Sequence, residues 1–114
     1  MEDCIFCKIV KGDIPSEKVY EDELILAFKD INPEAPIHIV VIPKKHIESL
    51  NELTEKDADI VAHIYIKTKE LAQELGINKK GYRIVTNCGE QGGQTVNHLH
   101  FHVLGGRNLQ WPPG

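Results

Sequence analysis

The sequence predicts an α+β fold with an antiparallel sheet, one long helix and a short N-terminal helix. Short apolar runs bounded by Glu-Asp, Asn-Pro and Pro predict strands on both sides of a single long segment with helical periodicity. The strands before this segment follow one another directly, as in a hairpin or meander. This order predicts a sheet covered by segregated helices.

The first part of the chain is expected to form the short helix and three strands. Residues 5–10 predict a helix that has Cys4 and Cys7 on one face, and Gly12 can end it in the left-handed conformation. The three strands are expected at residues 19–20, 24–28 and 37–42.

The long helix and two further strands are expected in the rest of the chain. Thr54 can cap the helix, and Asp57 lies near its positive end. Side chains at helical spacing then continue up to Gly76: Val61, Ile64, Thr68, Leu71 and Leu75. Strands are expected at residues 82–86 and 99–104, separated by a glycine-rich loop at residues 87–94.

Length and charge narrow the possible classes of protein. The 114 residues have room for one domain, expected to span residues 1–114, and the formal net charge is −4. A 41% hydrophobic fraction and 26% charged residues argue against a disordered chain and against a dedicated nucleic-acid binder. No leader or membrane-spanning run is evident, so a cytoplasmic protein without a membrane partner is expected.

Three of the six histidines, His98, His100 and His102, alternate with apolar residues near the end of the chain. A strand would place the three imidazoles on one face and Leu99 and Phe101 in the core. If this face of the strand were only exposed to solvent, Thr, Lys or Glu would serve as well as three histidines. The pattern therefore favours either a zinc site or catalysis by an imidazole nucleophile whose neighbours move protons.

The segment before these histidines, residues 92–95, reads Gly-Gly-Gln-Thr. It offers unobstructed backbone N–H groups and a hydroxyl, which suit phosphate oxygens, although a Gly-Gly pair alone is more often an ordinary turn. Beside an imidazole nucleophile, a phosphate cradle is what nucleotidyl transfer requires.

The three cysteines are Cys4, Cys7 and Cys88. Their odd number and the absence of a secretion signal indicate reduced thiols. The spacing of Cys4 and Cys7 supplies half of a tetrahedral zinc site, or simply two small apolar side chains near the N-terminus.

The segment from Gly93 to Leu104, Gly-Gln-Thr-Val-Asn-His-Leu-His-Phe-His-Val-Leu, resembles the signature of the histidine triad (HIT) superfamily. Residues 30–38, 41–46, 105–107 and 111–114 resemble its Hint branch, the nucleotide-binding phosphoramidases. The resemblance implies a HIT-like fold and an enzyme that hydrolyses purine nucleoside 5′-monophosphoramidates. A dinucleoside polyphosphate hydrolase and a nucleotide-binding scaffold with incidental hydrolysis are the alternatives.

By this resemblance His100 is the nucleophile, His102 contacts the phosphate and serves as acid to the leaving nitrogen, and His38 lies behind them. The implied contacts to phosphate and ribose are Asp30, Asn87, Gly93, Gln94 and Thr95, and those to the base are Phe6, Ile9, Phe28 and Ile31. Without the resemblance, Asp30 would be read as a turn residue, and Phe6 and Phe28 as core.

Some members of the superfamily hold zinc, and the matching residues here are Cys4, Cys7, His46 and His98. Two sulfur and two nitrogen ligands form a closed set, so this zinc would be structural, with no catalytic metal. The family also implies a homodimer, in which Trp111 reaches the neighbouring site. The partners expected are purine nucleotides such as AMP and GMP, with the choice between adenine and guanine open. His63 is expected to be structural or on the surface, and Cys88 receives no role.

Overall fold

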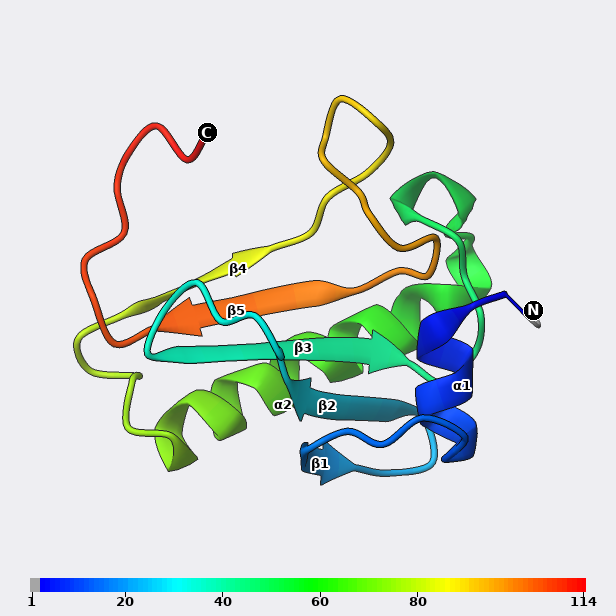
Figure 1. The fold of residues 1–114 in the computed structure, drawn as a ribbon, viewed down its shortest axis with the longest axis horizontal. Helices are drawn as coiled ribbons and strands as arrows, with labels where there is room; N and C mark the ends of the chain where they lie inside the picture. The colour runs from blue at the N-terminus through cyan, green and yellow to red at the C-terminus, as the bar shows by residue number, and fades with distance from the viewer. Residues whose placement is uncertain (1–2) are drawn as a thin grey trace.

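A five-stranded antiparallel sheet in the order β1-β2-β3-β5-β4 forms the framework of the computed structural model, which describes residues 3–114 (Figure 1). The strands are β1 Lys18–Glu21, β2 Ile25–Lys29, β3 Ile37–Pro43, β4 Tyr82–Val85 and β5 Phe101–Gly105. The predicted α+β class and the five strands are confirmed. Strands β3 and β5 are distant in sequence but adjacent in the sheet, with Val40 opposite His102 and Val41 opposite Phe101.

Helix α2, Ala58–Glu74, covers one face of the sheet along its length (Figure 1). Its apolar stripe, including Ile64 and Leu71, packs on inward-facing residues of the central strands such as Val41, Phe101 and Val103. The chain turns at Gly76, whose φ of 75° is the left-handed conformation that glycine adopts without strain.

The long helix begins later than the sequence indicated. Thr54 precedes a 3₁₀ turn, Glu55–Asp57, and only then does α2 start. The Asp57 carboxylate accepts hydrogen bonds from the Thr54 backbone N–H at 3.1 Å and the Lys45 ammonium at 2.6 Å, which holds this turn in place. A preceding 3₁₀ turn, Leu50–Glu52, was not expected.

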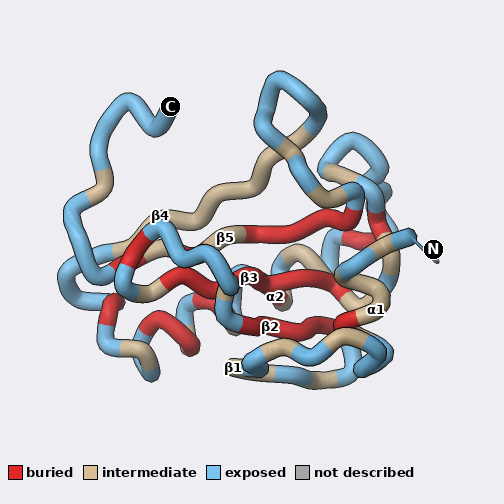
Figure 2. Tube along the Cα trace, in the orientation of Figure 1, coloured by how far each residue is buried: buried red, intermediate tan, exposed pale blue. Residues whose placement is uncertain are grey.

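Helix α1, Ile5–Lys11, lies against one end of the opposite face (Figure 1). Ile9 and the neighbouring Phe6 pack on Leu26, Phe28 and Val40. Because both faces of β2 and β3 are covered, their residues are buried in almost continuous runs (Figure 2). Within residues 3–114, neither helix has the length and hydropathy needed to cross a membrane.

Strand β5 begins at Phe101, two residues later than expected, so the prediction that one regular strand carries all three histidines is wrong for His98 and His100, and only His102 lies in β5. The Leu99 N–H donates to the Ile47 carbonyl at 2.6 Å, in the segment after β3. The His98 ring is held by the Pro43 carbonyl at 2.8 Å. These contacts hold residues 98–99 outside the sheet ladder, and His100, whose carbonyl accepts the Thr86 hydroxyl, also precedes the strand. Phe101 and Val103 still face the α2 core, as predicted.

Candidate functional site

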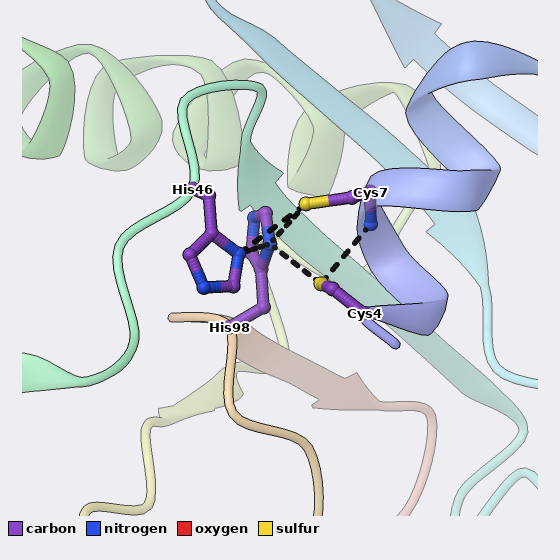
Figure 3. Close-up of side chains that lie close together, drawn as sticks. All are labelled: Cys4, Cys7, His46 and His98. Atoms are coloured by element: carbon purple, nitrogen blue, oxygen red, sulfur yellow. Dashed lines mark hydrogen bonds between the residues drawn. The ribbon is translucent and has the colours of Figure 1, made fainter. Parts of the chain in front are cut away.

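Cys4, Cys7, His46 and His98 lie together between helix α1, the segment after β3 and the segment before β5 (Figure 3). The His98 Nδ1 is 3.3 Å from the Cys4 Sγ, 3.6 Å from the Cys7 Sγ and 3.2 Å from the His46 Nδ1. The His46 Nδ1 is 3.3 Å from the Cys7 Sγ. Four potential metal ligands from three distant segments therefore point at one centre.

The spacing of these four atoms fits a tetrahedral metal ion. Zinc binds nitrogen at about 2.0–2.1 Å and sulfur at about 2.3 Å, so neighbouring ligand atoms in a tetrahedron lie roughly 3.3–3.8 Å apart. The distances of 3.2–3.6 Å between the sulfur and nitrogen atoms are close to these tetrahedral edges. The cluster can thus hold a metal ion with all four positions supplied by the protein.

Hydrogen bonds with backbone groups orient His98 and stabilise the thiolate form of Cys4 as metal ligands. The His98 Nε2–H donates to the Pro43 carbonyl, which leaves the His98 Nδ1 lone pair directed at the cluster. The Cys7 N–H donates to the Cys4 Sγ at 3.2 Å, a contact that stabilises a thiolate. In the metal-free chain, burial and the Cys4 thiol raise the pKa of Cys7 to about 11, so a cation is needed to hold it as thiolate.

His100 is 3% exposed and has a defined tautomer. Its Nδ1 lies 2.7 Å from the His98 carbonyl, which can only accept, so Nδ1 carries the proton and Nε2 keeps its lone pair. The Phe6 ring meets the His100 ring edge-on, with centroids 5.1 Å apart. His100 therefore offers a fixed nitrogen lone pair, as a nucleophile requires.

His102 and His38 form a hydrogen-bonded pair on the same face of the sheet. The Glu34 N–H donates to the His38 Nδ1 at 3.0 Å, so His38 must carry its proton on Nε2. That Nε2–H donates to the His102 Nδ1 at 2.9 Å, which places the His102 proton on Nε2. Burial, followed by His100 and His38, lowers the pKa of His102 below its ordinary value, whereas Asp30 opposes this shift.

Asp30 joins this pair and also makes a turn. Its Oδ1 accepts the Asn32 N–H at 2.8 Å, which is the turn role that the residue type alone favours. Its Oδ2 lies 3.4 Å from the His38 Nε2 and 3.9 Å from the His102 Nδ1. Atoms of Asp30, His38 and His102 are near enough for a metal ion, but the proton on the His38 Nε2 makes this a hydrogen-bonded relay.

The glycine-rich loop at residues 87–94 contains more internal hydrogen bonds than its composition indicated. The Gly93 N–H donates to the Glu90 carbonyl and the Gln94 N–H to the Gly89 carbonyl. The Gln94 side chain is also engaged, accepting the Gly89 N–H and donating to the carbonyls of Glu48 and Val96. Gln94 therefore pins the loop to the segment after β3, while the Thr95 side chain is exposed.

The apolar residues expected around a base divide into two groups. Ile9 and Phe28 are buried in the core beneath α1, with 7% and 5% exposure, and Phe6 is half-buried beside them. Ile31 is 90% exposed, next to Asp30. Asn87 is half-buried in the segment after β4. The structure thus brings Phe6 to His100, and leaves Ile31 as an exposed apolar side chain adjacent in sequence to Asp30.

Sequence reasoning missed the backbone groups that set the proton positions, namely the Glu34 N–H and the Pro43 carbonyl. It also missed the Thr86 hydroxyl, which donates to the His100 carbonyl at 2.8 Å. His63, for which only a structural or surface role was expected, lies 2.6 Å from the Asp22 carboxylate and ties α2 to the β1–β2 turn. The flanking Pro33 and Pro36 were the available signal for a fixed loop around Glu34.

Comparisons with known proteins identify the family of this chain. The family model described as "Scavenger mRNA decapping enzyme C-term binding" matches residues 3–110. A HIT-like protein of Synechocystis sp. is 51% identical over 113 residues, which cover 99% of this chain and 98% of the relative.

Solved structures match over nearly the whole chain. A HIT family hydrolase from Legionella pneumophila has a TM-score of 0.97 and 51% identity, covering 98% of this chain and 100% of that one. A histidine triad protein from Clostridium difficile has a TM-score of 0.93 and 53% identity, covering 96% of each chain. The chain belongs to the histidine triad (HIT) family.

Proposed function

We propose that this protein is a nucleotide-binding hydrolase of the Hint type, which cleaves the P–N bond of purine nucleoside 5′-monophosphoramidates. The observation that carries the proposal is the proton arrangement at the triad. The His98 carbonyl leaves the His100 Nε2 unprotonated, and the pair of His38 and His102 presents an N–H beside it. A fixed lone pair next to a fixed donor suits attack on phosphorus.

The reaction has two displacements at phosphorus. The His100 Nε2 attacks, a new N–P bond forms, and the bond to the substrate amine breaks while the amine nitrogen gains a proton. Water then attacks the same phosphorus, the His100–P bond breaks, and the nucleoside monophosphate leaves. Overall, one water molecule is consumed, giving its hydrogen to the amine and its hydroxyl to phosphorus.

In this scheme, His102 binds the phosphate and acts as the general acid. Its neutral Nε2–H donates a hydrogen bond to the phosphate, and its protonated form supplies the proton to the leaving nitrogen. Burial disfavours that protonated form in the free protein. The anionic phosphate and the Asp30 carboxylate, 3.9 Å from the His102 Nδ1, both favour it, so substrate binding itself primes the acid.

The nucleotide contacts follow from the surroundings of this pair. We assign the ribose hydroxyls to Asp30 Oδ2 and Asn87, and the phosphate to the Gly93–Thr95 segment, with the Thr95 hydroxyl as donor. The base lies against the exposed Ile31, with Phe6 as the next apolar surface. The buried Ile9 and Phe28 support Phe6 from behind. These apolar contacts admit either purine.

Two further parts of the proposal concern assembly. We assign a structural zinc ion to Cys4, Cys7, His46 and His98, where it would tie α1 to the catalytic segment and take no part in the chemistry.

We also infer a homodimer. Strand β4 is an edge of the sheet, and Trp111 near the C-terminus is 81% exposed, a surface that a second copy would cover.

The test compares the wild-type protein with His100→Ala and His100→Asn on adenosine and guanosine 5′-phosphoramidates. Wild-type turnover is expected, with loss by at least about 10³-fold in both variants and retained AMP binding by calorimetry. His63→Asn, which alters a histidine on α2, is the control. A ³²P-labelled substrate should leave label on the acid-labile His100 adduct.

The alternatives predict different results. Faster hydrolysis of diadenosine polyphosphates than of phosphoramidates would indicate the dinucleotide hydrolase. AMP binding with negligible wild-type turnover would indicate a scaffold, and unchanged turnover in the His100 variants would remove His100 as nucleophile. Light scattering tests the dimer separately, and a monomer at the assay concentration would refute it.

A further inference from the structure

Arg107, which lies two residues after β5, reaches across to the loop between β2 and β3. Its Nε and Nη2 donate to the Glu34 carbonyl at 3.2 and 2.9 Å, and its Nη1 donates to the Asn108 carbonyl at 3.0 Å. Two N–H groups of the guanidinium fork thus converge on one backbone oxygen. This contact joins residues that are 73 positions apart in the chain.

The loop that Arg107 contacts has few other restraints. Within residues 31–36, the hydrogen bonds of the described structure are those of the Asn32 N–H, the Glu34 N–H and the Glu34 carbonyl. The first two end within the same hairpin, so among the described residues Arg107 makes the hydrogen bonds that link this loop to another part of the fold. Gly106 allows the approach, because a Cβ there would lie 2.9 Å from the Pro36 Cβ.

Glu34 connects this anchor to the active site through its backbone. Its carbonyl is held by Arg107, and its N–H donates to the His38 Nδ1. A backbone N–H cannot accept, so His38 has no choice of tautomer while this contact lasts. The His38 Nε2–H in turn leaves the His102 proton on Nε2. If the Glu34 peptide groups rotate, both imidazoles become free to exchange tautomers.

We propose that Arg107 is a positioning residue for His102. By holding the Glu34 carbonyl, Arg107 keeps the Glu34 N–H on His38. His38 in turn fixes the tautomer in which His102 presents its Nε2–H to the substrate. This inference rests on the proposed function for its catalytic consequence. Its structural part, the tautomer of His102, holds in the free protein and is measured without substrate.

Arg83 provides a matched control. Its Nη2 donates to the Gln110 carbonyl at 3.0 Å, so it too is an arginine that holds a backbone oxygen near the C-terminus. Among the described residues, its side chain makes no hydrogen bond to the β2–β3 loop. A role of Arg107 in merely anchoring the C-terminal segment would therefore be shared by Arg83, whereas control of the His102 tautomer would not.

The experiment uses the full-length protein and its Arg107→Ala, Arg107→Lys and Arg83→Ala variants. Long-range ¹H–¹⁵N spectra of the imidazoles report the tautomers, with His102→Asn used to assign the His102 signals. We expect the Nε2–H tautomer of His102 in the wild type and in Arg83→Ala. Arg107→Ala should give a mixture of both tautomers, and Arg107→Lys, which retains one donor, an intermediate result.

Kinetics with adenosine phosphoramidate give the second measurement. Arg107→Ala should lower kcat about 10-fold with little change in KM, since the nucleotide contacts remain while the donor is misplaced. Arg83→Ala should leave both within twofold. The proposal is overturned if Arg107→Ala keeps the wild-type tautomer, if the wild type carries its His102 proton on Nδ1, or if Arg83→Ala shows the same kcat loss. If the tautomer changes but the wild type has no phosphoramidase activity, the positioning role stands and the proposed function fails.

Discussion

Removal of the proposed zinc ion from the Cys4, Cys7, His46 and His98 cluster is the most direct test of that assignment. The perturbation is dialysis of the protein against a strong chelator, or the variant Cys7→Ser. Because four pairs of these ligand atoms already lie 3.2–3.6 Å apart in the fold, we expect zinc to bind the folded chain in preference to the unfolded one. Zinc removal should therefore lower the melting temperature without destroying the core beneath α2.

The expected shift follows from mass action. Free zinc at about 1,000 times its Kd stabilises the folded state by about 4 kcal/mol. With about 2.1 cal/mol/K per residue, 114 residues give an unfolding entropy of about 240 cal/mol/K near 60 °C. Dividing one by the other predicts a fall in melting temperature of about 17 °C on chelation.

The assay combines metal analysis, calorimetry and thiol titration. Protein purified without chelator should contain one zinc per chain, and Cys88→Ser, which alters the cysteine outside the cluster, should retain it. Only Cys88 should react rapidly with a thiol reagent until chelator exposes Cys4 and Cys7. Absence of stoichiometric zinc, or a melting temperature that neither chelator nor Cys7→Ser changes, would refute the reasoning.

Three further predictions concern stability and binding. Asp22→Ala should lower the unfolding free energy by about 3 kcal/mol at pH 7, because its carboxylate accepts two backbone N–H groups and contacts Tyr20 and His63. Burial raises the pKa of Asp22, but these bonds outweigh that effect and hold the pKa far below its ordinary value, so the contribution is present above about pH 4 and is lost as the pH falls further. Ile64→Ala, at a site 1% exposed, should cost about 3–4 kcal/mol in urea unfolding. Ile31→Ser should weaken AMP binding about fivefold by calorimetry with no loss of stability, since Ile31 is 90% exposed in the free chain.

Each of these predictions has an outcome that would contradict it. Equal pH dependence of unfolding in wild type and Asp22→Ala would mean that the carboxylate is not held as described. A cost below about 1 kcal/mol for Ile64→Ala would contradict close packing of α2 on the sheet. Unchanged AMP affinity in Ile31→Ser would remove Ile31 from the base site.

The sequence by itself determined the elements and the residues that carry chemistry. Local patterns were sufficient for this: Gly12 ends α1 with φ of 85°, and alternation places Phe101 and Val103 in the core. Strand periodicity and left-handed caps depend on near neighbours, so they can be read along the chain. The alternation of histidines likewise indicated that imidazoles share one face, but it extended the strand over His98 and His100, which both precede β5 in the structure.

Only the tertiary structure decided how those residues are held. Convergence of Cys4 and Cys7 with His46 and His98 depends on contacts between segments up to 94 positions apart, for which the C-x-x-C spacing carries no information. The proton positions depend on backbone groups such as the Glu34 N–H. Every residue other than proline has such a group, so no residue type marks it, and only the folded chain shows which one meets an imidazole.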